Sequence, residues 1–222
     1  RSVSRGLGDV YKRQKSYKEV KMSLAITQTI AVLQVVVQTV PLGTNIALLQ
    51  LMWTIVNGSF LQSRGAIFPA LVANGHSPRA SRRIWQAFRH GVWRIDDSLS
   101  HFRDYVAQEE KWVAHRYEGY QPVAVDWTAI WRLRLKGWSG KLFHSLAGRA
   151  LRGIGFGLVC EVGEVDGQRI PLLRRIIRTN PKDRSEKKLK EETLRWVKHH
   201  FADKEVAIID AGVEISDMQR LG

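Results

Sequence analysis

Apolar residues recur at helical spacing through the first half of the chain and gather into short, strand-like runs in the second half. In the first half, apolar positions three or four residues apart predict helices that bury one side. Helix starts and stops follow from capping residues, glycine and proline. The predicted helices cover residues 24–40, 46–56, 64–72, a segment that begins after Ser77, and 96–117.

The second half has the pattern of a sheet interrupted by one helix. Residues 123–126 form an apolar run that predicts a first strand, and residues 154–165 and 168–177 predict a hairpin around Asp166-Gly167. Ser185 can cap a helix that leads to a last apolar run, residues 206–210. The predicted order is β-β-β-α-β, so the fold class is an N-terminal helical part followed by an α/β part.

Composition divides the chain into three segments. Residues 4–14 resemble the conceptual translation of an adaptor used in transposon-based sequencing libraries, so residues 1–14 are interpreted as a non-native scar and left out of fold reasoning. The turn at residues 118–122 marks the change from helical to strand periodicity. The sequence therefore predicts a helical domain over residues 15–118 and a second domain over residues 119–222.

The chain is strongly basic, with a formal net charge of +14 over 222 residues. A basic balance favours a nucleic-acid partner, although it also suits membrane-surface and ribosomal proteins. Residues 22–63 lack charged side chains, but glutamines, Pro41 and Gly43 interrupt them before any run reaches the roughly 20 apolar residues of a membrane span. The single cysteine, Cys160, excludes an internal disulfide and fits a reducing compartment, so we expect a cytoplasmic protein without a membrane segment.

The spacing of residues 64–72, a tight turn at 73–76 and a helix capped by Ser77 is that of a helix-turn-helix. Basic and amide side chains on the second helix recur at helical spacing and share one face, opposite an apolar face. Such a face can contact phosphates and guanine in the major groove, whereas the simpler alternative is a solvated helix surface. The predicted DNA-binding residues are Arg79, Arg82, Arg83, Gln86 and Arg89.

Two aspartates, Asp126 and Asp210, each end one of the predicted buried strands. A carboxylate there is costly unless it binds a cation or a partner group. A lone carboxylate at a strand end is usually a cap or half of a salt bridge, but two such ends in this topology indicate a metal site. Next to a basic surface, the chemistry that fits is metal-assisted attack on a phosphodiester.

These features together resemble a DDE-type transposase of a bacterial insertion sequence, whose catalytic core is ribonuclease H-like. The resemblance spans roughly residues 45–222 and includes the segments around Asp126 and Asp210. It implies that both aspartates are catalytic ligands of two Mg²⁺ ions, with a later glutamate expected beyond Gly222. The core would then be incomplete and this fragment inactive. The implied partner is double-stranded DNA, as transposon ends and as target. A homodimer on the DNA is left open. The implied location is the bacterial cytoplasm, at the nucleoid when DNA is bound.

Two other functions remain open: a ribonuclease H-like nuclease without strand transfer, and a non-catalytic DNA-binding protein in which the aspartates only terminate strands. Four further patterns have simpler interpretations. Gly153-Ile154-Gly155-Phe156-Gly157 lacks the context of a phosphate loop and predicts close backbone packing or a bulge. The acidic pair Asp96-Asp97 suits the N-terminus of a helix, and the pair His199-His200 suits a helix C-terminus, where cations are favoured. The tryptophans could stack on flipped bases, but their spacing favours the core.

Overall fold

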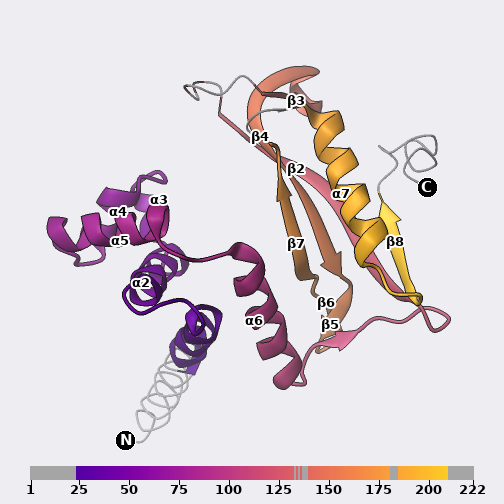
Figure 1. The fold of residues 1–222 in the computed structure, drawn as a ribbon, viewed down its shortest axis with the longest axis horizontal. Coiled ribbons are helices and arrows are strands. Elements are labelled where there is room, and N and C mark those ends of the chain that lie inside the picture. Colours follow the sequence, from indigo (N-terminus) through magenta and orange to yellow (C-terminus); the bar gives the residue numbers. More distant parts are fainter. Residues whose placement is uncertain (1–23, 133, 135, 137–139, 181–184, 210–222) are drawn as a thin grey trace, which may run out of the picture. The chain divides into compact units, whose positions relative to one another are not determined.

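A computed structural model describes residues 24–132, 134, 136, 140–180 and 185–209. The chain is a mixed helical and sheet protein, as predicted, and it divides into two compact units, Arg1–Phe102 and Arg103–Gly222. The first unit is helical, and the second contains the sheet (Figure 1).

The helical unit contains a helix over residues 24–37 and a series of further helices after it. Ala47, Leu51, Leu71 and Ile84 form its main buried cluster. Burial of these four side chains holds the helices together, and Ile84 comes from the apolar face predicted for the helix that follows Ser77. The helices that follow are α2 (Thr44–Val56), α3 (Ser59–Gln62), α4 (Ile67–Ala73), α5 (Pro78–His90) and α6 (Ile95–Gln108), which runs into the second unit.

Two predicted helix starts are wrong. The N-cap of α2 is Gly43, at φ 90°, whereas Asn45 lies inside the helix, where its Oδ1 accepts a hydrogen bond of 2.7 Å from the Ile46 N–H. Helix α4 begins at Ile67 rather than at residue 64, because Arg64 and Gly65 have φ values of 52° and 81°. Left-handed residues cannot belong to an α-helix, so they form the preceding turn.

The predicted helix over residues 96–117 is too long at its C-terminal end. Asp96 and Asp97 lie in the first turn of α6, as expected, but the helix ends at Gln108 and Glu110 has a φ of 52°. The chain then forms strand β1 (Val113–Ala114), which pairs with Gly163 and Glu164. The pairing with β5 (Gly163–Val165) is more favourable here than a continued helix, and local periodicity does not reveal such a non-local pairing.

The second unit contains a five-stranded sheet in which four strands follow the order β3-β4-β2-β8. Strand β3 pairs with residues 149–152 of β4, and β7 pairs with residues 156–161 of the same strand. Strand β2 runs antiparallel to β4 and parallel to β8. Strands β1, β5 and β6 form a separate small sheet, and the unit also contains the helix α7 (Figure 1). Their bounds are β2 (Gln121–Trp131), β3 (Lys141–His144), η1 (Ser145–Ala147), β4 (Arg149–Glu161), β5 (Gly163–Val165), β6 (Gln168–Arg169), β7 (Leu172–Arg178), α7 (Glu186–His200) and β8 (Glu205–Ile209).

The predicted hairpin forms around Asp166-Gly167, whose φ values of 51° and 75° suit a tight two-residue turn. Each predicted strand is divided in two. Residues 154–165 belong to β4 and β5, and residues 168–177 belong to β6 and β7. The tip of the hairpin thereby pairs with β1, while its base joins the main sheet.

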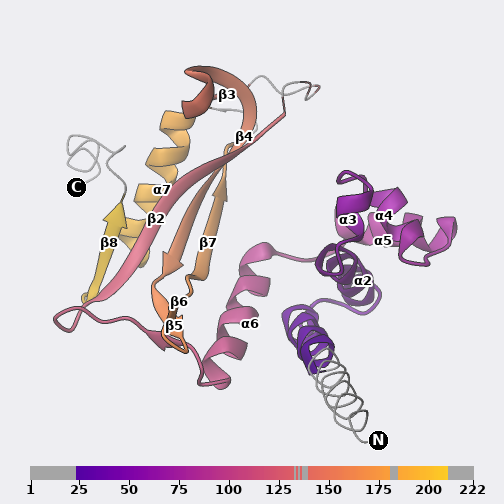
Figure 2. The same cartoon turned by 180° about the vertical axis from the view of Figure 1, so that it is seen from behind.

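Helix α7 covers one face of the main sheet, as the front and back views show (Figures 1 and 2). Val123, Val125 and Val159 of the sheet form a buried cluster with Val197 of the helix. Glycines of β4 allow close approach: a Cβ added to Gly157 would lie 2.2 Å from Thr193 Oγ1. The glycine pattern is therefore a packing feature of a strand, as the sequence predicts.

Gly157→Ala is expected to destabilise the protein by about 1–3 kcal/mol, because the added methyl group has no space beneath α7. The free energy of unfolding, obtained from chemical denaturation, measures the effect. Gly153→Ala is the control and should destabilise the protein less, since its Cβ would lie 3.1 Å from the nearest atom. The double variant Gly157→Ala/Thr193→Ala should recover part of the loss. Equal effects of Gly153→Ala and Gly157→Ala would contradict this account of the packing.

Within the described part of the chain, no helix combines the length and the apolar character needed to cross a membrane.

Candidate functional site

Asp126 lies on the sheet face opposite α7. Its neighbours Val125 and Trp127 belong to the cluster beneath the helix, so alternation directs the aspartate to the other face. The side chain is exposed, and Oδ1 accepts a hydrogen bond of 2.7 Å from the backbone N–H of Trp127. The predicted strand end at Asp126 is wrong, because pairing with β4 continues β2 to Trp131.

The thiol of Cys160 is close enough to Asp126 to sense its charge. Burial raises the pKa of the half-buried Cys160 thiol, and the negative charge of Asp126 raises it further. The thiol is therefore protonated at neutral pH and is a poor metal ligand or nucleophile. Asp126 is the side chain on this face with the chemistry of a cation ligand, and the described residues supply it with no ion-pair partner.

Strand β8 approaches Asp126 from the neighbouring position in the sheet. In the parallel register Val125 is opposite Ile209, the last described residue. The second predicted ligand, Asp210, lies outside the described residues. Among the described residues, no group of three or more histidine, cysteine, aspartate or glutamate side chains could hold a metal ion. The exposed carboxylate of Asp126 fits a magnesium ligand, since hard cations prefer such oxygens.

The start of β8 is held in place by Arg174 of β7. Its Nη1 lies 2.7 Å from Glu205 Oε1, and its Nη2 donates to the carbonyl oxygen of His200 at 2.6 Å. The guanidinium also lies 5.6 Å from the ring centroids of Trp196 and Phe201. This cluster joins β7, the end of α7 and β8, and thus positions the strand that leads to Asp210.

Glu205 should contribute stability that depends on pH. Burial alone would raise the pKa of this carboxyl, but hydrogen bonds from Arg174 and the Ala202 N–H, with the charges of Arg174 and Arg103, hold it below its ordinary 4.5. A lowered pKa in the folded state stabilises the protein above the ordinary value and loses that effect as pH falls through the folded pKa.

We therefore expect Glu205→Gln to reduce the free energy of unfolding at pH 7 and to have a progressively smaller effect below about pH 4.5. Denaturation curves of both proteins at several pH values measure the difference. The exposed Glu164→Gln is the matched control and should show little effect at any pH. A difference between wild type and Glu205→Gln that stays constant down to acid pH would contradict the linkage.

Helix α5 presents the predicted basic face to solvent. Its N-cap Ser77 accepts a hydrogen bond from Ala80 N, with Pro78 in the first turn, as predicted. Ser81 and Ile84 are buried on the opposite side. Within the described part of the chain, none of the arginines on the basic face forms an ion pair. All five predicted DNA-binding side chains are exposed: Arg79, Arg82, Arg83, Gln86 and Arg89.

The turn before α5 is tied to the rest of the helical unit. Asn74 Nδ2 donates to Thr54 Oγ1 at 3.0 Å, and Asn57 Nδ2 donates to Asn74 Oδ1 at 2.7 Å. Gly75, at φ 86°, supplies the left-handed residue of the turn. These bonds fix the start of α5 relative to α2, so the helix that carries the basic face has a defined position within the helical unit.

The second unit has a small pocket that the sequence did not predict. It has a volume of about 130 Å³ and lies between β2, β3 and the start of α7; its walls include Trp127, Trp131, Phe143 and Glu186. The pattern Trp127-x-Ala129-x-Trp131 has the period of a strand and could have revealed one wall. It was missed because the strand was predicted to stop at Asp126.

His200, at the end of α7, packs against its own helix, as the simpler interpretation expects. His200 Nδ1 lies 2.8 Å from the carbonyl oxygen of Trp196, and the two rings are stacked. Both His199 and His200 lie in the last turn, where a cation suits the helix dipole.

Comparisons of the chain with models of protein families, with curated proteins and with solved structures gave no match.

Proposed function

We propose that this chain is part of a DNA transposase that binds transposon ends through its helical unit and uses Asp126 with Asp210 in metal-dependent cleavage and strand transfer. The observation that carries the proposal is the parallel pairing of β2 with β8. It joins the first and last strands of the β-β-β-α-β order as neighbours and sets Val125 opposite Ile209. Asp126 and Asp210 are the next residues in the sequence of the two strands.

The proposed metal ligands suit magnesium. Asp126 has an exposed carboxylate on a sheet face, and Asp210 would supply a second hard oxygen ligand. When bound, a pair of Mg²⁺ ions supplies activation of the attacking oxygen and stabilisation of the leaving oxygen in phosphodiester chemistry. The protein's own contribution is the parallel pairing of β2 with β8, and the Arg174–Glu205 ion pair supports the start of β8.

The exposed basic face of α5 supports double-stranded DNA as the partner. Four arginines and one glutamine on a capped helix of 13 residues can reach phosphates and base edges in a major groove. The hydrogen-bonded turn before this helix supports the helix-turn-helix interpretation.

A non-catalytic DNA-binding protein is the second candidate, favoured by one observation: the Asp126 carboxylate is exposed and accepts a hydrogen bond from the Trp127 N–H, as a solvated strand residue can without a metal. Binding of Mn²⁺ as a probe for Mg²⁺ separates the two. A transposase site should bind the ion and lose it with Asp126→Asn, while a non-catalytic protein should show no difference between wild type and variant.

A further inference from the structure

We propose that the pocket between β2, β3 and the first turn of α7 binds an unpaired nucleobase. This inference rests on the proposed binding of DNA and adds a separate contact for one base. The pocket has a volume of about 130 Å³ and is lined by Trp127, Trp131, Phe143, Glu186 and the aliphatic side chains around them. A flat aromatic ligand with a polar edge matches such walls.

Aromatic surface at the pocket is left open to solvent. Phe143 is 60% exposed and Trp131 is 37% exposed, while the Trp131 ring packs against His144 with a centroid distance of 4.4 Å. Exposed aromatic rings at a concave site are suited to stacking, which stabilises bound single-stranded bases without selecting their sequence.

The inner wall of the pocket is preformed. Trp127 Nε1 donates to Thr193 Oγ1 at 3.3 Å, and Lys190 Nζ lies 5.9 Å from the Trp127 ring centroid. Gly155 and Gly157 let α7 approach the sheet closely at this point. A base would therefore enter between fixed side chains, with little ordering required on binding.

Glu186 gives the pocket a hydrogen-bond acceptor. Its Oε2 accepts from the Phe143 N–H at 3.3 Å, and its Oε1 lies 3.4 Å from Lys190 Nζ. Each carboxylate oxygen has further lone pairs, which can accept from the exocyclic amino group of cytosine or adenine. Thymine has no such amino group, so the pocket should prefer an unpaired cytosine to an unpaired thymine.

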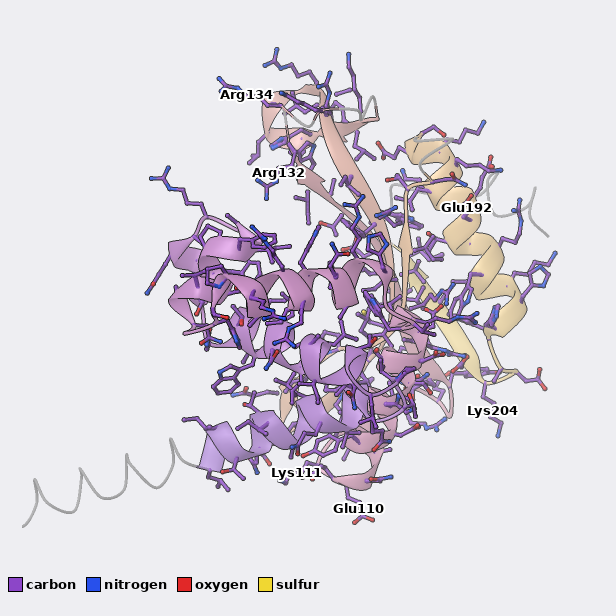
Figure 3. All side chains as sticks on the ribbon, turned by 60° about the vertical axis from the view of Figure 1, so that its left-hand side comes forward. Glu110, Lys111, Arg132, Arg134, Glu192 and Lys204 are labelled. Atoms are coloured by element: carbon purple, nitrogen blue, oxygen red, sulfur yellow. The ribbon has the colours of Figure 1, made fainter. Side chains whose placement is uncertain are left out.

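The charge around the pocket distinguishes a nucleotide from a cation. Aromatic walls with a carboxylate could also hold a quaternary ammonium group. The residues nearby are basic, however, with exposed side chains of Arg132, Arg134, Lys141 and Lys187 on the segments that border the pocket. Figure 3 shows Arg132 and Arg134 where β2 ends. These cations repel an ammonium ligand and attract the phosphates that flank a base.

The test measures binding of the full chain to two fluorescein-labelled DNA duplexes, one fully paired and one identical except for a single bulged cytosine. We expect wild type to prefer the bulged duplex. Phe143→Ala should weaken binding of the bulged duplex by roughly 5- to 100-fold and leave the paired duplex nearly unchanged. Leu146→Ala, which removes a neighbouring side chain that is 93% exposed, is the matched control and should change neither affinity.

A second variant tests the role of the carboxylate. Glu186→Gln should reduce the preference for a bulged cytosine over a bulged thymine, because the amide can also donate to thymine. The pocket inference is overturned if wild type binds paired and bulged duplexes equally, if Phe143→Ala weakens both alike, or if tetramethylammonium competes with the bulged duplex. Absence of binding to either duplex would instead overturn the proposed DNA-binding function, and the pocket inference with it.

Discussion

Removal of the arginines from the basic face of α5 is expected to lower the affinity of the chain for duplex DNA by roughly 100-fold or more at fixed salt. Each guanidinium can neutralise a phosphate and release a counterion, so the slope of log K against log salt should also fall by about 3 to 4. Fluorescence anisotropy across a salt series measures the affinity and its dependence on salt concentration. The substitutions are Arg79→Ala, Arg82→Ala, Arg83→Ala and Arg89→Ala.

The fold should survive this change, because all four side chains are exposed and alanine favours helices. A variant with the same loss of charge at other exposed positions of the chain is the control, and circular dichroism checks helix content. If both variants lose affinity equally, α5 is a solvated basic face and the net charge alone accounts for binding. The control substitutions are Lys111→Ala, Arg116→Ala, Arg169→Ala and Lys204→Ala.

Asp126→Asn is expected to weaken Mn²⁺ binding by at least about tenfold while duplex DNA affinity changes little. The amide keeps the size of the side chain and one acceptor oxygen, so the hydrogen bond from the Trp127 N–H can persist, but the negative charge that attracts the cation is lost. Titration of Mn²⁺ followed by electron paramagnetic resonance measures the free ion. The exposed Asp126 has few contacts to lose, so folding should be preserved.

Asp203→Asn removes another exposed carboxylate from the same unit and serves as the control. It should leave Mn²⁺ binding unchanged. Equal binding by wild type and Asp126→Asn would show that the aspartate is not a ligand. Loss of DNA binding together with Mn²⁺ binding would make Asp126 a structural residue, in disagreement with its exposed position.

Local patterns predicted the elements whose boundaries depend on nearby residues. Ser77 and Ser185 cap α5 and α7 as expected, and the hairpin turns at Asp166-Gly167. These features were predictable because capping and turn residues act within a few positions of one another. The apolar face of α5 was equally visible, since Ile84 is buried opposite the exposed basic side chains and the period follows from helix geometry.

Features set by pairing between distant segments were predicted less well. Strand β1 replaces the end of a predicted helix because it pairs with β5, some 50 residues later. Asp126 lies within β2 because pairing with β4 continues to Trp131, and the same extension forms the pocket wall. A polar residue inside an exposed sheet face does not interrupt a strand, although it ends the apolar run in the sequence.

The most direct test of the proposed metal site uses Fe²⁺ in place of Mg²⁺, with ascorbate and peroxide. Hydroxyl radicals formed at the bound iron cut the nearby backbone, and mass spectrometry locates the cuts. If Asp126 and Asp210 share a site, wild type should be cut beside both residues, excess Mg²⁺ should suppress both cuts, and Asp126→Asn should lose both together. Cuts near only one aspartate, or cuts that persist in Asp126→Asn, would contradict a shared metal site.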